Sequence, residues 1–144
     1  MQILVPVDIE DALRVDLADL YERLGITGVD FAAMPVPATL GDLPATRTLV
    51  TIRRVGGSRS SLVVDTHAVS LDVYAGTWAE SIAEANRLAG VICSLPRVDD
   101  LSSTYHEAEI TNQPVELPDT TDPALPRVRL SASVSVKSDI IEMS

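Results

Sequence analysis

The chain has 144 residues, with 11 lysines and arginines against 21 aspartates and glutamates, and so a formal net charge of −10. This length is typical of one domain whose core is large enough to fold without disulfides. Hydrophobic residues make up 46% of the chain and charged residues 22%, a balance that excludes wholesale disorder. Because aromatic residues make up only 3%, we expect an aliphatic core.

Charge and cysteine content exclude several function classes. Proteins that bind nucleic acid without sequence preference need clustered basic residues, whereas this chain has one lysine, Lys137, and scattered arginines. The single cysteine, Cys93, excludes an intrachain disulfide and a cysteine metal cluster. No basic leader precedes an apolar run, and no segment approaches the ~18 apolar residues of a membrane helix. We expect a protein of the reducing cytoplasm, or of a particle assembled there, that does not bind membranes.

Residues 8–24 are predicted to form an amphipathic helix, with Asp8 as its N-cap and Gly25 just beyond its end. Its apolar positions recur with helical spacing, at Leu13, Leu17, Leu20 and Leu24. We expect acidic side chains on its outer face, at Asp16, Asp19 and Glu22.

Three stretches are predicted to lack regular structure, the first two because of their prolines and glycines. Residues 26–47 are expected to form a long loop, with a short extended piece near Val29–Phe31. Residues 112–126 contain four prolines and are expected to be an irregular connection. Residues 138–144 are expected to be a loose tail.

The remaining segments predict strands and a second helix. Residues 48–55 and 62–75 form a hairpin whose turn is the glycine-containing stretch 56–61. Residues 105–111 form a weak strand, and residues 127–137 form the clearest one, because apolar and polar side chains alternate along it.

Residues 77–95 are predicted to form a second amphipathic helix, which Pro96 ends. Thr77 and Glu80 have the spacing of a capping box. The expected buried seam consists of Trp78, Ile82, Ala85, Ala89 and Ile92. Together these elements predict one α+β domain over residues 1–144, with two amphipathic helices packed on one face of a mostly antiparallel sheet.

The residues capable of chemistry favour structural roles. His67 follows Asp65 on the apolar face of a predicted strand, where a hydrogen-bonded core histidine is commoner than a metal ligand. His106, Glu107 and Glu109 alternate between faces and do not converge. Further candidates are interpreted as turn hydroxyls, loop charges and a small core residue, namely Ser58, Ser60, Ser61, Asp99, Asp100, Asp119, Asp122 and Cys93.

A basic group at the predicted hairpin end is the best candidate for an interaction site. Arg53, Arg54 and Arg59 place three positive charges on an otherwise acidic molecule, while residues 8–24 carry six acids and two arginines. Separate basic and acidic surfaces suit head-to-tail association, in which unlike surfaces meet and a ring closes.

The order of these segments resembles a known family. An acidic helix beginning VDIEDAL is followed by a proline-rich loop, then RTLVTIRRVGG, DTHAVSLDVYA and TWAESIAEANRL. A second proline-rich segment leads to PRVRLSASVSVK. This pattern, over residues 7–137, resembles the tail terminator proteins of long-tailed actinobacteriophages, and more broadly tail-completion and head–tail joining proteins.

The resemblance implies a virion structural protein without enzymatic activity or cofactor. Such proteins form a ring, usually of six subunits, at the head-proximal end of the tail. The ring caps the tail tube, stops its polymerisation and presents a surface to the head connector protein. DNA would pass through the lumen without sequence-specific binding, which suits an acidic protein. The three arginines would contact a neighbouring subunit or the tube.

Three alternatives remain open from the sequence. A head-closure or connector protein shares this size and location. A small-molecule enzyme would use His67 with Asp65 or Glu109, and would need a deep pocket around them. An acidic binding module that mimics nucleic acid would be a monomer or dimer and would bind a basic host protein.

Overall fold

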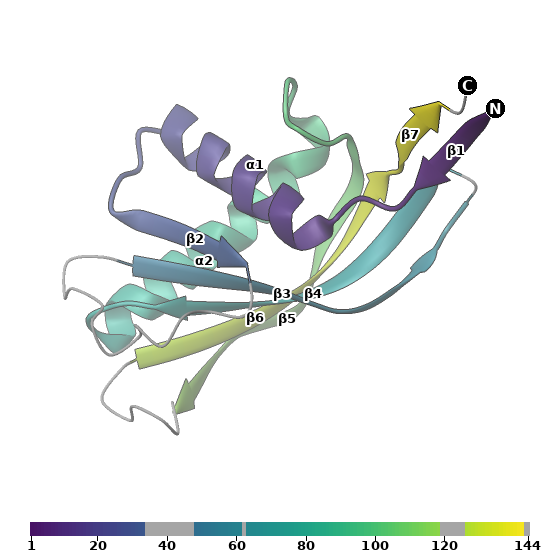
Figure 1. Ribbon diagram of the computed structural model, residues 1–144. Helices are drawn as coiled ribbons and strands as arrows, with labels where there is room; N and C mark the ends of the chain where they lie inside the picture. Colours follow the sequence, from purple (N-terminus) through teal and green to yellow (C-terminus); the bar gives the residue numbers. More distant parts are fainter. Residues whose placement is uncertain (34–47, 62, 119–125, 143–144) are drawn as a thin grey trace.

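The computed structural model describes residues 1–33, 48–61, 63–118 and 126–142. A layer of two helices lies on a five-stranded sheet, and a separate two-stranded ribbon projects from one end (Figure 1). The elements in chain order are β1 (Gln2–Val5), α1 (Ile9–Arg23), β2 (Val29–Ala33), β3 (Thr48–Arg59), β4 (Val64–Tyr74), α2 (Trp78–Ser94), the 3₁₀ turn η2 (Leu95–Arg97), β5 (Tyr105–Pro118), β6 (Pro126–Lys137) and β7 (Asp139–Glu142).

The large sheet has the strand order β2-β3-β4-β6-β5. Strands β3, β4, β6 and β5 pair antiparallel, while β2 runs parallel to β3. The α+β class with a mostly antiparallel sheet is therefore confirmed. The β3–β4 hairpin and the extended piece near Val29–Phe31 are also confirmed, whereas the rest of that predicted loop, residues 34–47, lies outside the described residues.

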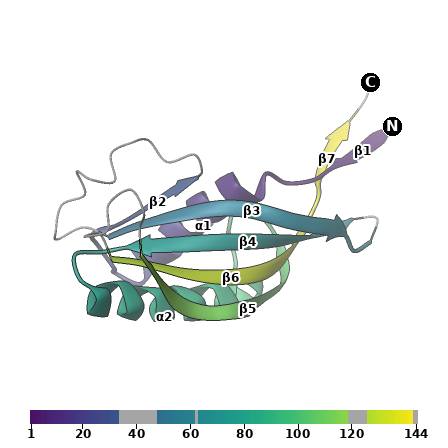
Figure 2. The same cartoon turned by 90° about the horizontal axis from the view of Figure 1, so that it is seen from below.

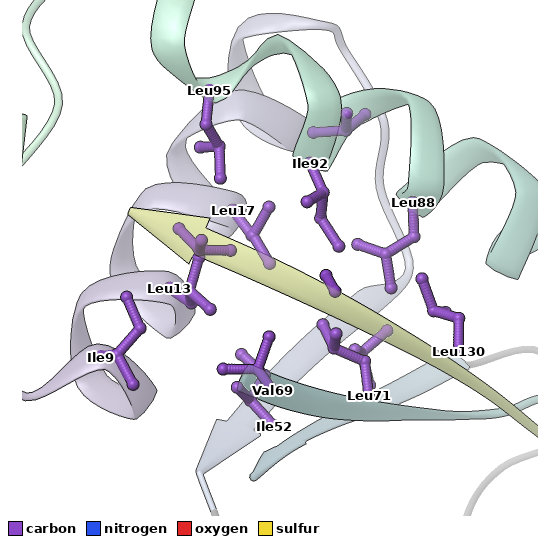
Figure 3. Close-up of a cluster of buried hydrophobic side chains, with 14 of the residues drawn as sticks. Ile9, Leu13, Leu17, Ile52, Val69, Leu71, Leu88, Ile92, Leu95 and Leu130 are labelled. Carbon is purple, nitrogen blue, oxygen red and sulfur yellow. The ribbon is translucent and has the colours of Figure 1, made fainter. Parts of the chain in front are cut away.

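Both helices cover the same face of the sheet, as Figure 2 shows from the sheet side. Because side chains alternate along a strand, Val69, Leu71 and Val73 of β4 and the apolar side chains of β6 from Val128 to Val136 point toward the helices. They meet leucines and isoleucines of α1 and α2 in one cluster (Figure 3). Its fully buried members include Leu13, Leu17, Leu71, Leu88, Ile92 and Leu130.

Helix α1 begins and ends where local signals predict. The Asp8 carboxylate accepts a hydrogen bond from the Asp11 backbone N–H at 3.4 Å. Gly25 has a φ of +74°, and its N–H donates to the Glu22 carbonyl, which closes the helix. The predicted apolar stripe stops at Leu20, because Leu24 is 61% exposed.

The expectation that Asp16 faces solvent is wrong. Its side chain is fully buried and accepts hydrogen bonds from the Tyr105 hydroxyl at 2.6 Å and the Ser102 backbone N–H at 2.7 Å. A helical carboxylate beside an apolar stripe turns inward when the neighbouring segment supplies donors. Asp16 thereby connects α1 to the start of β5.

Helix α2 has the predicted cap but a rotated buried face. The Thr77 hydroxyl accepts a hydrogen bond from the Glu80 N–H at 3.1 Å. Trp78, expected in the seam, is 36% exposed, whereas Ser81 and Glu84 are buried. The Ser81 hydroxyl accepts from the Ala75 N–H and donates to the Pro126 carbonyl, so specific partners draw these polar side chains inward.

The predicted glycine turn at residues 56–61 is wrong for residues 56–59. Gly56 and Gly57 lie within β3, which continues to Arg59 and pairs there with Asp65 of β4. The pairing register shifts between Arg54 and Gly56, which marks a β-bulge. Glycine in a strand often marks such a bulge or a close backbone approach rather than a turn.

The irregular connection predicted at residues 112–126 is wrong for residues 112–118, because β5 continues through them. Pro114 is tolerated since β5 is an edge strand and its register shifts between Asn112 and Val115. Residues 119–125 lie outside the described part of the chain.

The expected loose tail at residues 138–144 is wrong for residues 139–142. These form β7, which pairs antiparallel with β1 in the register Gln2↔Glu142 to Val5↔Asp139. The two strands are not joined by a turn and lie far apart in the sequence, so no local pattern predicts their pairing. Residues 143–144 lie outside the described part.

The buried Asp16 carboxylate generates a stability prediction. Asp16→Ala leaves the Tyr105 hydroxyl and the Ser102 N–H without an acceptor, so we expect a loss of about 2–4 kcal/mol in the free energy of unfolding. Urea denaturation measures it. Glu22→Ala, which removes an exposed carboxylate from the same helix, is the control and should change stability by less than about 0.5 kcal/mol. Equal effects of the two substitutions would contradict the anchoring role of Asp16.

Candidate functional site

The three predicted site arginines lie on β3 but on two different faces of the sheet. Arg53 pairs with Ser70, on the side away from the helices, whereas Arg54 pairs with Val69 and Arg59 with Asp65, on the helix side. The structure therefore brings Arg54 and Arg59 to one face and does not join Arg53 to them. The predicted single basic group at the hairpin end is corrected to this divided arrangement.

Arg54 is held by two contacts at the base of the hairpin. Its backbone N–H donates to Glu10 Oε2 at 2.8 Å, which links β3 to the first turn of α1. Its Nε donates to His67 Nδ1 at 2.9 Å. Arg54 thus has an internal structural role, although the residue as a whole is exposed.

Arg59 is anchored on the neighbouring strand. Its Nε donates to Asp65 Oδ1 at 3.0 Å, while Asp65 Oδ2 accepts from the Ser138 hydroxyl at 2.8 Å. The Arg59 hydrogen bond is the main cause that holds the pKa of Asp65 below its usual range. Since Ser138 directly precedes β7, this carboxylate connects the hairpin to the base of the ribbon.

His67 is buried in its neutral form. Its Nδ1 accepts from Arg54, so the ring proton is assigned to Nε2, a buried atom without a hydrogen-bond partner among the described residues. Burial is the main cause that lowers the pKa of His67, and the Arg54 guanidinium lowers it further, while Asp65 opposes the shift. Protonation would place a second positive charge beside Arg54.

Arg53 differs from the other two arginines. Its side chain is exposed and forms no ion pair with another described residue. Asp72, on the neighbouring strand β4, is paired with Arg127 at 3.0 Å and with Arg129 at 2.8 Å. Among the described residues, Arg53 is thus the member of the predicted group whose guanidinium neither a carboxylate nor an imidazole binds.

The geometry does not assemble the catalytic alternative. His67 is 3% exposed and Asp65 is 5% exposed, so little of either side chain is within reach of a substrate. The Asp65 carboxylate is already occupied by Arg59 and Ser138. Glu109, the other proposed partner of His67, is exposed on β5.

Of the other candidate residues, Asp119 and Asp122 lie outside the described part of the chain. Cys93, expected in the core, is exposed at the end of α2. It lines an open hollow of about 670 Å³ together with Arg97, Glu107 and Glu109. Among the described residues, no group of three or more His, Cys, Asp or Glu is placed to hold a metal ion. Neither described helix has the length and apolar character needed to cross a membrane.

The sequence reasoning missed the β1–β7 ribbon. Its aliphatic side chains are partly or largely exposed, with Ile3 at 39%, Ile140 at 49% and Ile141 at 50%. The signal was present in the sequence as two short aliphatic runs, ILV near one end of the described chain and II near the other. The pairing of β1 with β7 brings these two aliphatic runs together on one surface.

The fold has a counterpart among solved structures. No protein-family model matches the chain, and no curated protein matches it. One similar solved chain comes from the "Virion of native gene transfer agent (GTA) particle", with a TM-score of 0.53 and 18% sequence identity. The match covers 90% of this chain and 91% of that chain, so the two share a fold over nearly their full lengths.

The close approach of β4 to Gly57 generates a matched pair of glycine predictions. A Cβ at Gly57 would lie 2.4 Å from the Thr66 carbonyl oxygen, and the φ of +149° strains any other residue. We expect Gly57→Ala to lower the free energy of unfolding by about 2–4 kcal/mol. Gly90→Ala on α2 meets no atom within 4 Å and should instead raise it by about 0.5–1 kcal/mol. Thermal and urea denaturation of both variants test this close approach, and a neutral Gly57→Ala would contradict it.

The buried neutral His67 generates a pH prediction. Its pKa is lower in the folded than in the unfolded chain, so the unfolded state binds the proton first as the pH falls. Above about pH 6.5 the contribution of neutral His67 to the free energy of unfolding is therefore fully present. Below that pH the free energy of unfolding falls, with a slope of at most about 1.4 kcal/mol per pH unit.

Urea denaturation of wild type and His67→Gln between neutral pH and pH 5 measures this slope, which should flatten in the variant. His106→Gln, which removes an exposed imidazole, tests whether the effect belongs to His67. A wild-type slope that survives in His67→Gln would disprove the assignment.

Proposed function

We propose that this chain is a structural protein of a phage-like virion that forms a ring, caps the tail tube and stops its polymerisation. The ring would also present the surface that the head connector protein joins. The observation that carries the proposal is the shared fold, over 90% of the chain, with a chain of a gene transfer agent virion particle. The segment order that resembles tail terminator proteins supports the same role independently.

The chemistry of the described residues fits binding better than catalysis. The imidazole and carboxylate closest to an enzymatic pair, His67 and Asp65, are buried and serve to hold the β3–β4 hairpin. A net charge of −10 suits a ring through which DNA must slide, because an acidic surface repels phosphates. We infer that the protein acts in the virion, at the head-proximal end of the tail, after assembly in the host cytoplasm.

Within this function the three arginines have different roles. Arg53 is the one whose charge is available to a neighbouring subunit or the tube. Arg54 and Arg59 position the hairpin through His67 and Asp65. A triple alanine variant would therefore mix lost contacts with lost stability, and Arg53 is the residue to test alone.

Deleting the gene from the particle's genome tests the terminator role. Electron microscopy of the resulting particles should show tails longer than normal and without heads, because nothing stops tube polymerisation. Expression of the protein in trans should restore the normal tail length. Tails of normal length beside empty heads would instead assign the chain to head closure, and normal infectious particles would contradict any role in assembly.

A further inference from the structure

The β1–β7 ribbon projects from the body of the molecule and carries aliphatic side chains on both faces. Strands β1 and β7 pack mainly against each other, and Figures 1 and 2 both show them beyond the end of the sheet. Their register places Ile3 beside Ile141 on one face and Leu4 beside Ile140 on the other. By the same alternation, Asp139 shares the face of Ile3 and Ile141, while Gln2 and Glu142 share the other face.

An isolated two-stranded ribbon is at best marginally stable in water. Here the exposed isoleucines, Ile3, Ile140 and Ile141, retain 39–50% of their surface in solvent. Clustered exposed aliphatic side chains mark a surface that binds another protein. The ribbon therefore has the character of an arm that is completed by a partner.

The charge of the ribbon restricts the partner. Asp139 and Glu142 are its charged residues, and neither β1 nor β7 contains a lysine or arginine. Glu142 accepts a hydrogen bond from the Gln2 side chain, whereas Asp139 is exposed at the ribbon's base. A complementary surface must offer aliphatic contact together with a free cation.

The molecule itself carries such a surface on β3. Arg53 is exposed without an ion pair among the described residues, and Val55, two residues further, is 60% exposed. The strand neighbours Thr51 and Ser70 are uncharged. We refer to Arg53 and Val55 as the acceptor surface.

Two other described surfaces fit an acidic ribbon less well. The hollow beside Arg97 is also lined by Glu107 and Glu109, which would repel Asp139. The same glutamates and Pro114 lie on the edge strand β5, and such residues discourage strand pairing at an edge.

We propose that the ribbon of one copy docks on the acceptor surface of a second copy of this chain. Arg53 lies on the sheet face away from the helices, while the ribbon leads through Pro6 and Val7 into α1 on the helix face. One chain cannot bring its own ribbon around the sheet, so the contact joins unlike surfaces of successive copies. Repeated contacts of this kind close into a ring when the rotation between copies permits. This inference rests on the proposed ring-forming function for its biological meaning.

Oligomeric state in solution tests the proposal on the full chain. Sedimentation velocity and native mass spectrometry, over a wide concentration range, should show wild type associating into a closed oligomer. Ile141→Ser should weaken this association by about tenfold or more, because an aliphatic side chain is no longer buried. Leu24→Ser removes an exposed leucine at the end of α1 and should leave association unchanged. Circular dichroism checks that both variants are folded.

A charge exchange identifies the acceptor. Arg53→Glu and Asp139→Arg should each weaken association, and the combined variant should return it to within about threefold of wild type. Rescue of this kind is not expected from a variant that merely folds poorly. A wild-type chain that stays monomeric, an Ile141→Ser variant that associates normally, or the absence of rescue would overturn the proposal.

The two proposals fail in different measurements. Overlong tails in the deletion mutant together with normal association of Ile141→Ser would leave the terminator role standing and remove the ribbon contact. Ribbon-dependent association together with tails of normal length would keep the contact and remove the terminator role.

Discussion

The alternation of apolar and small polar side chains along β4 and β6 is the constraint on which the rest of the structure depends. Because most of their apolar side chains point to one side, α1 and α2 share that side. The opposite face is left to serines, threonines and the arginines of β6, with Asp72 held between Arg127 and Arg129. That division also places Arg53 on the sheet face that the helices do not cover, where the residue is exposed.

Within this aliphatic frame, three buried carboxylates fix elements that lie far apart in the sequence. Asp16 connects α1 to β5, Glu84 accepts from the Tyr21 hydroxyl between the helices, and Asp65 connects the hairpin to Ser138. A buried carboxylate adds little net stability when its partners are present, but losing one partner is costly. We interpret these groups as selecting one arrangement of the helices and hairpin among several of similar apolar burial.

Features encoded in a few neighbouring residues could be predicted from the sequence. The Asp8 and Thr77 caps, the Gly25 helix end and the β6 alternation all depend on local chemistry. Features that depend on distant partners could not, and the inward turn of Asp16 is one of these. The candidate site was predicted only in part. The sequence identified the three arginines, but it does not reveal the bulge and the strand pairing of β3, which divide them between two faces.

The ribbon has a consequence for the timing of biosynthesis. Gln2 and Glu142 are separated by 140 positions, so β1 has no strand to pair with until nearly all of the described chain has left the ribosome. Contacts of such long sequence separation also form late in folding, after more local elements are in place. A nascent chain would therefore lack the proposed association arm while its hydrophobic core is still incomplete, which would keep polysome-bound copies from joining one another prematurely.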